Sequence, residues 1–166
     1  MRRVLVLVTF AAFALGAAEP AFAEVPILLR TPGSQLVELD RGNGRAVIAK
    51  RGSVVVTLHG AGRLRIVDLP GSGRPRWNCG DKPETRVNAT TVQFHGPNLR
   101  CIVWSGSGGG PWQVVIRGRG IFASGRVRGS LTLDAPNEGP TGRYRIGNGS
   151  WKRWPRVAHT YVLRRI

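Results

Sequence analysis

Short apolar runs rich in valine, isoleucine and leucine recur along most of this chain, and clusters of Gly, Pro, Asn and Asp separate them. After residue 24 no window shows the 3.6-residue apolar period of an amphipathic helix with capping residues. The runs therefore predict strands at residues 35–39, 45–50, 53–59, 63–69, 86–95, 99–104, 112–117, 126–134, 143–146 and 159–164. About ten short strands at this spacing indicate a single all-β domain, folded as a sandwich, a barrel or a β-roll.

The first 23 residues have the layout of a secretory signal peptide. Two arginines precede an apolar run over residues 4–18, and Ala21 and Ala23 supply small side chains at the two positions that a signal peptidase recognises. The apolar run is about 15 residues long, which is shorter than the roughly 20 needed to span a bilayer as a helix. The sequence predicts cleavage before Glu24 and a mature domain, residues 24–166, without a transmembrane segment. We expect this domain to be secreted or held at the cell envelope, in an extracellular or periplasmic setting.

The stretch "SGSGGGPWQVVIRGRG" (105–120) raises the question of a phosphate-binding loop. A P-loop needs Lys-Ser/Thr after its last glycine and then a helix, but Pro111 and Trp112 stand there instead. Gly118 and Gly120 begin a loose dinucleotide fingerprint, yet a strand-like segment follows where a helix N-terminus would hold the pyrophosphate. We interpret the glycines as residues of turns and bulges, and we predict neither a nucleotide nor another cofactor.

Two segments echo one another weakly: "VTLHGAGRLRI" (56–66) and "VVIRGRGIFAS" (114–124). In each, a strand-like run ends in a basic residue, and glycines and further apolar residues follow. The echo suggests hairpin-like units that share one sheet system.

The charge balance is strongly basic. Without residues 1–23, which contain Arg2, Arg3 and Glu19, there remain 23 basic and 8 acidic side chains, and the formal net charge is +15. Such a charge favours anionic partners, such as envelope polymers, nucleic acid or acidic lipid. Arginines far outnumber the three lysines, and part of this bias can reflect a GC-rich genome rather than function.

Two cysteines in an exported chain indicate one disulfide, between Cys79 and Cys101. Neither cysteine has a second cysteine or a histidine at the spacing of zinc ligands, so no metal site is predicted. A free thiol is the remaining alternative. A bridge that closes a loop of about 23 residues stabilises a fold by roughly 3 kcal/mol in the chain-entropy model.

No catalytic constellation is evident. No serine lies in a G-x-S-x-G motif, and the three histidines, His59, His95 and His159, are far apart in the sequence. A glycosidase would need two neighbouring carboxylates, and the sequence does not single out a pair. We therefore favour a non-enzymatic protein and assign no catalytic residue.

Arginines alternate with apolar residues in three strand-like segments. Because successive side chains of a strand point to opposite faces, each pair should project away from the core, and neighbouring strands would make one basic sheet face. Guanidinium groups bind carboxylates and phosphates through paired hydrogen bonds. The alternative is a solvated face that reflects codon usage. The predicted polyanion-binding residues are Arg63, Arg65, Arg126, Arg128, Arg143 and Arg145.

The segment "WKRWPR" (151–156) places Trp151 and Trp154 around two basic residues. This pattern suits stacking on sugars or bases, but closure of the core beside "HTYVL" is the favoured interpretation.

The segments "VVIRGRGIFASGRVRGSLTLD" (114–134) and "GRYRIGNGSWKRWP" (142–155) resemble small exported, Gly/Arg-rich β proteins of GC-rich actinobacteria. The resemblance implies an exported β domain and no particular activity. We thus expect a secreted, non-enzymatic envelope or extracellular domain that binds anionic polymers through an arginine-rich sheet face. Two other classes stay open: a cell-wall glycan hydrolase, and a structural surface protein that assembles through its sheet edges.

Overall fold

The computed structural model describes residues 34–106, 110–135 and 142–163, so the predicted signal peptide lies outside the described residues. The described chain is all-β, as predicted, and contains no helix. Its ten strands belong to one sheet. Their bounds are β1 (Gln35–Leu58), β2 (Gly62–Asp68), β3 (Pro75–Asn78), β4 (Thr85–Asn88), β5 (Thr91–His95), β6 (Leu99–Ser105), β7 (Trp112–Asp134), β8 (Arg143–Ile146), β9 (Lys152–Arg153) and β10 (His159–Leu163).

Most of the sheet is one long antiparallel ribbon whose tip is the turn between β4 and β5. Residues about equally far from this tip pair with one another along the whole ribbon. Examples are Thr85↔Gln93 near the tip, then Pro75↔Ser105, Gly62↔Gly118, Gly52↔Val127 and Arg45↔Asp134. The tip itself is fixed by Asn88, whose side-chain carbonyl accepts a hydrogen bond from the Thr90 N–H at 3.0 Å.

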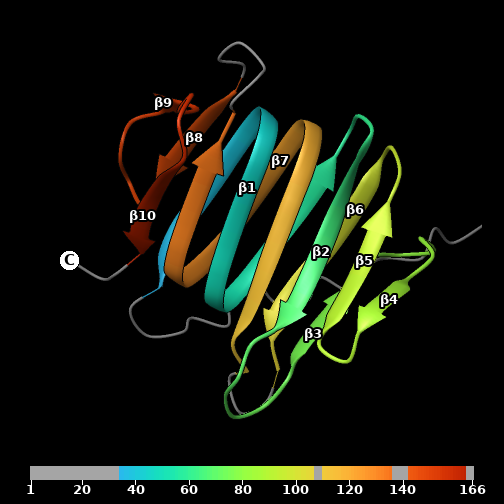
Figure 1. Ribbon diagram of the computed structural model, residues 1–166. Helices are drawn as coiled ribbons and strands as arrows, with labels where there is room; N and C mark the ends of the chain where they lie inside the picture. The colour runs from blue at the N-terminus through green and yellow to red at the C-terminus, as the bar shows by residue number, and fades with distance from the viewer. Residues whose placement is uncertain (1–33, 107–109, 136–141, 164–166) are drawn as a thin grey trace, which may run out of the picture.

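This ribbon is rolled up into two facing layers (Figure 1). The long strands β1 and β7 pass from one layer to the other, and each contributes three segments to the roll. Layer I, at the front of Figure 1, runs in the order β4, β5, β2, 112–118 of β7, 45–50 of β1, 129–134 of β7, and β10. Layer II runs in the order β3, β6, 51–58 of β1, 121–128 of β7, 35–39 of β1, β8 and β9. Of the predicted alternatives, this architecture is closest to the β-roll.

Glycines lie where the ribbon changes layers. Gly52, between the second and third segments of β1, has φ +124°, a backbone conformation that side chains other than glycine rarely adopt. At the opposite side of the roll, the two echo segments (56–66 and 114–124) pair with each other, with Gly62 opposite Gly118. Gly118 and Gly120 therefore belong to strand β7 and its bend, as the turn-and-bulge interpretation proposed, whereas residues 107–109 of the same stretch lie outside the described residues.

The core fills the space between the layers, and alternate residues of every long segment point into it. It consists mainly of valine, leucine and isoleucine, together with the fully buried Trp112 and Trp154. The ring of Trp154 lies directly over Gly42, where an added Cβ would be 1.8 Å from it. Core closure is therefore confirmed for Trp154. Trp151, by contrast, is 39 % exposed and outside the core.

Individual strands differ from the prediction in several places. The predicted strands 112–117 and 126–134 are one continuous strand, β7, and the two-residue strand β9 was not predicted. The predicted strands 35–39, 45–50 and 53–59 are one continuous strand, because positive φ at Arg41 and Gly44 lets the chain bend without leaving the sheet. The predicted strand 86–95 is two strands, since Asn88 makes the tip turn. Strand β3 was missed because its proline resembles a turn, although proline is tolerated at the first residue of a strand.

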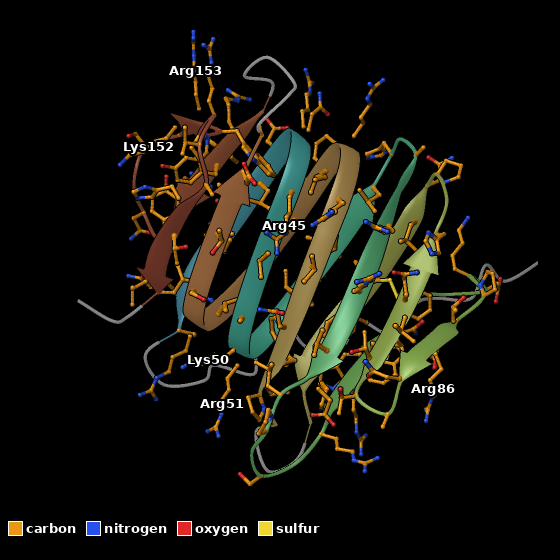
Figure 2. All side chains as sticks on the ribbon, viewed as in Figure 1. Arg45, Lys50, Arg51, Arg86, Lys152 and Arg153 are labelled. Atoms are coloured by element: carbon orange, nitrogen blue, oxygen red, sulfur yellow. A yellow bond between two sulfur atoms is a disulfide. The ribbon has the colours of Figure 1, made fainter. Side chains whose placement is uncertain are left out.

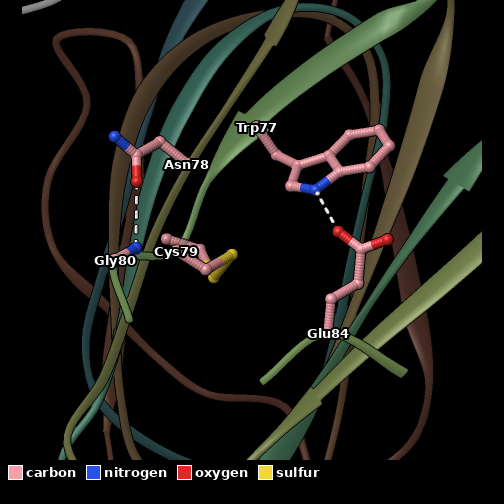
Figure 3. The surroundings of a disulfide bond; sticks show 6 residues. Trp77, Asn78, Cys79, Gly80 and Glu84 are labelled. Carbon is pink, nitrogen blue, oxygen red and sulfur yellow. Dashed lines mark hydrogen bonds between the residues drawn. A yellow bond between two sulfur atoms is a disulfide. The ribbon is translucent and has the colours of Figure 1, made fainter. Parts of the chain in front are cut away.

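The predicted disulfide between Cys79 and Cys101 is present, and both residues are buried (Figure 3). It joins the end of β3 to β6 across 22 residues, and the enclosed loop contains the β4–β5 hairpin. Polar contacts surround it: Asn78 accepts a hydrogen bond from the Gly80 N–H at 2.9 Å, and the Trp77 indole donates to Glu84 at 3.1 Å.

Strand β10 is held by a pair of tyrosines. The hydroxyl groups of Tyr144 and Tyr161 are 2.6 Å apart. Burial, and then the hydrogen bond with Tyr144, raise the pKa of Tyr161 above its ordinary value of about 10. The fold therefore favours the protonated hydroxyl, and this stabilisation is present below pH 10 and is lost as the pH rises further. We expect urea unfolding to show a larger loss of stability between pH 8 and pH 11 for the wild type than for Tyr161→Phe; equal losses would contradict this.

Candidate anion-binding site

The structure confirms the alternation around the predicted arginines but distributes them over both layers. Arg63 and Arg65 lie on β2 in layer I, where Leu64 and Ile66 point into the core. The other predicted residues lie in layer II: Arg126 and Arg128 on β7, and Arg143 and Arg145 on β8. Strand β2 neighbours neither β8 nor the 121–128 segment of β7. The six side chains therefore do not form one face.

The two arginines of β8 are engaged by carboxylates of β1. A guanidinium nitrogen of Arg143 lies 2.6 Å from a carboxylate oxygen of Asp40, and Arg145 pairs with Glu38 in the same way. The indole ring of Trp151 covers both guanidiniums, with centroid distances of 5.4 and 5.0 Å. These contacts attach β8 to β1. The positions of Arg143 and Arg145 are therefore better explained by a structural role than by ligand binding.

Layer I contains a denser arginine cluster that the sequence did not reveal. Arg63 of β2 lies directly opposite Arg117 of β7, and Arg117 lies directly opposite Arg45 of β1. We call these three residues the arginine row. His95 of β5 extends it beyond Arg63, and Asp134 lies next to Arg45 at the other end. Directly opposite residues of antiparallel strands have Cβ atoms about 5 Å apart, so the guanidiniums can reach one common ligand.

A hollow of about 290 Å³ lies over the arginine row. We call it the arginine groove. Its floor is the outward face of β2, β7 and β1, and the tip of the β4–β5 hairpin bounds one end. It is lined by Arg45, Arg63, Arg65, Arg117, Val67, Val87, Asn88, Thr91, Gln113 and Val115.

Two side chains show how the groove is built. The Arg65 guanidinium donates a hydrogen bond to the side-chain carbonyl of Gln93, which is only 8 % exposed and so holds that arginine in place. Arg45 lies in the middle of layer I (Figure 2) and is half-buried. Its Nε atom is buried, and no hydrogen-bond acceptor reaches it within the described residues.

The electrostatics of the arginine row favour an anion. Like charges directly opposite one another destabilise an antiparallel pair, and a buried donor without a partner costs about 1–3 kcal/mol. Among the described residues, none of the four groove arginines has a carboxylate within 4 Å; Asp134, although opposite Arg45 in the ladder, forms no ion pair with it. A phosphate, sulfate or carboxylate group would supply both the missing charge and the missing acceptors.

Sequence reasoning missed Arg45 and Arg117. Arg117 stands beside glycines at the end of a strand-like run, and Arg45 begins an otherwise apolar run, so neither belongs to a pattern of arginines that alternate with apolar residues. What brings them to Arg63 is the register between strands that are far apart in the sequence, and no local pattern carries that register.

A second hollow, of about 400 Å³, lies beside the disulfide. Its charged residues are Asp81, Lys82 and Arg100, so its charge is mixed. Lys82 donates to the Pro97 carbonyl at 3.2 Å, and Arg100 also has a partner within the protein. It lacks the excess of unpaired charge that distinguishes the arginine groove.

The carboxylates of the described chain do not present an uncommitted pair on one strand face. Glu38 and Asp40 point to the same side of β1, but they are the partners of Arg145 and Arg143. In the described ranges there is also no cluster of three or more His, Cys, Asp or Glu side chains that could hold a metal ion. The hydrolase alternative therefore gains no residues from the structure.

Comparisons with protein-family models, with curated proteins and with solved structures gave no match to this chain.

Proposed function

We propose that this protein is an exported, non-enzymatic domain that binds anionic polymers of the cell envelope or its surroundings through the arginine groove. The observation that carries the proposal is the arginine row: three adjacent guanidiniums without carboxylate partners among the described residues, one of them with a buried, unpartnered Nε. A disulfide is compatible with an extracellular setting. No helix within the described ranges is long and apolar enough to cross a membrane.

An anionic polymer fits the groove better than a small anion does. The row crosses three strands, and neighbouring strands are about 4.8 Å apart, so charged groups can be contacted at successive positions along a chain. Among the described residues, the groove lining includes the apolar side chains of Val67 and Val115 but no aromatic side chain that could stack on a base or a sugar. Binding should therefore follow charge density more than monomer identity.

The first test uses linear inorganic polyphosphate as the polymer. Exposed charges are screened over about 8 Å at physiological salt, so affinity measured by calorimetry should fall steeply across a salt series. Polygalacturonate, a carboxylate polymer, distinguishes charge from phosphate chemistry, and a neutral glucan should not bind. Absence of polyphosphate binding at low salt would overturn the proposal. A structural protein that assembles through its edges would instead oligomerise without any polymer.

The residue of the row that has the buried, unpartnered Nε gives the sharpest variant. Arg45→Met keeps a long apolar stem in the groove but removes the guanidinium, and we expect about a tenfold loss of polyphosphate affinity, as for the loss of one charged hydrogen bond. The domain should remain folded, because the unpartnered Nε and one like-charge contact also disappear. Arg153→Met, on the exposed strand β9, removes the same charge outside the groove and should change affinity by less than about twofold. Equal losses for the two variants would show that only net charge matters.

A further inference from the structure

We propose that the domain has a second anion-binding face on layer II and so cross-links two anionic polymer chains. This inference rests on the proposed function. The second face consists of Arg51, Arg126 and Arg128. Arg51 of β1 lies directly opposite Arg128 of β7, and Arg126 occupies the next outward position on the same strand. All three are exposed, and within the described part of the chain none is in an ion pair.

The two faces point in opposite directions. In layer II, Val54 and Val127 turn into the core, so Arg126 and Arg128 turn away from it. Arg51 extends from the edge of the roll next to Arg128 (Figure 2). In layer I, Ile48 and Ile116 turn into the same core, and the arginine row turns away on the other side. Packed layers lie about 10 Å apart, and the arginines extend beyond them on both sides. A straight polymer segment on one face cannot contact the other.

The acidic residues of layer II do not neutralise the positive charge of the second face. Glu38 and Asp40 lie on the outward side of the neighbouring β1 segment, but Arg145 and Arg143 already neutralise them. Arg126 lies between Ser53 and Leu36 in the ladder, and neither is charged. The positive charge of Arg51, Arg126 and Arg128 is therefore available to a second chain. Each polymer carries many binding positions, so a protein with two faces gives a network by multivalency.

The experiment measures binding and cross-linking separately with linear polyphosphate. Binding is measured by calorimetry at dilute protein, and cross-linking by turbidity and light scattering over a range of protein-to-polymer ratios. The wild type should give maximal scattering at an intermediate ratio and less at protein excess, when single faces saturate the polymer and the second faces find no free chain. No binding at all would defeat the proposed function, whereas binding without scattering would defeat only the cross-linking.

Three double variants with the same charge change assign the effect to the faces. Arg63→Glu/Arg117→Glu alters the arginine groove, Arg126→Glu/Arg128→Glu alters the second face, and Lys152→Glu/Arg153→Glu is the control on β9. Each face variant should keep binding through the other face but lose at least about tenfold in scattering, as expected when valency falls from two to one. The control should scatter like the wild type. Arg126→Gln/Arg128→Gln serves if the glutamates prevent folding.

Two results would overturn the inference. If the second-face variant scatters like the wild type while it stays folded, then the groove, alone or in a dimer, accounts for cross-linking. If the control loses scattering as much as the two face variants do, then aggregation follows net charge neutralisation and not the two faces.

Discussion

Replacement of Gly52 by alanine is expected to lower the free energy of unfolding by about 4 kcal/mol, which combines backbone strain with a steric clash. The φ of +124° disfavours any side chain, and an added Cβ would lie 2.1 Å from the carbonyl oxygen of Arg126. That oxygen belongs to the partner strand and cannot move without breaking the ladder between β1 and β7. Because small domains are stable by only about 5–15 kcal/mol, this loss is a large fraction of the total stability, and the variant should unfold at a clearly lower urea concentration than the wild type.

The variant Gly80→Ala separates backbone strain from the steric clash. Gly80 also has a positive φ, +62°, but no atom lies within 4 Å of the position that its Cβ would take. We expect this control to cost only about 1–2 kcal/mol, the penalty for the left-handed conformation. Urea unfolding followed by tryptophan fluorescence gives both values. Similar values for Gly52→Ala and Gly80→Ala would mean that the corner of the roll is not tightly packed.

The importance of Gly52 also shows why the rolled ribbon was not predicted in detail. Local patterns identified most strands, because alternation of apolar and polar residues is a property of each strand by itself. Glycines between them were assigned to turns and bulges. In the sequence, however, a glycine at a bend that ends a strand looks the same as a glycine at a bend that carries the strand into a second layer. The difference depends on close contacts such as that between Gly52 and Arg126, which are distant in sequence.

The candidate site was predictable only in part, for a related reason. The outward direction of Arg63 and Arg65 follows from Leu64 and Ile66 between and after them, and it was predicted. The register between strands decides which side chains lie next to each arginine. It places Arg117 between Arg63 and Arg45, whereas it places Arg143 next to Asp40, with which it forms an ion pair. Composition indicated a basic protein; only the pairing of strands separates arginines that stabilise the fold from arginines that are left for a ligand.

Removal of the disulfide is the second large effect that we expect. Cys79→Ala/Cys101→Ala should lower the free energy of unfolding by about 3 kcal/mol, because the unfolded chain regains the freedom of the closed loop. The loop spans 22 residues and includes the β4–β5 hairpin. Urea unfolding of the double variant and of the reduced wild type should agree. If the double variant is as stable as the oxidised wild type, then the β3–β6 pairing holds this part of the roll without the bridge.

The same double variant tests whether the arginine groove depends on overall stability. The disulfide lies in layer II, between the end of β3 and β6, whereas the groove floor is formed by β2, β7 and β1 in layer I. The ladder between β2 and β5 keeps the hairpin tip at the groove without the bridge. Polyphosphate affinity of the folded variant should therefore stay within about twofold of the wild type, since additivity holds for distant, independent sites. Arg45→Met should show the reverse, with lower affinity and unchanged stability. If the disulfide variant loses polyphosphate affinity in proportion to its loss of stability, then the groove forms only when the disulfide is present.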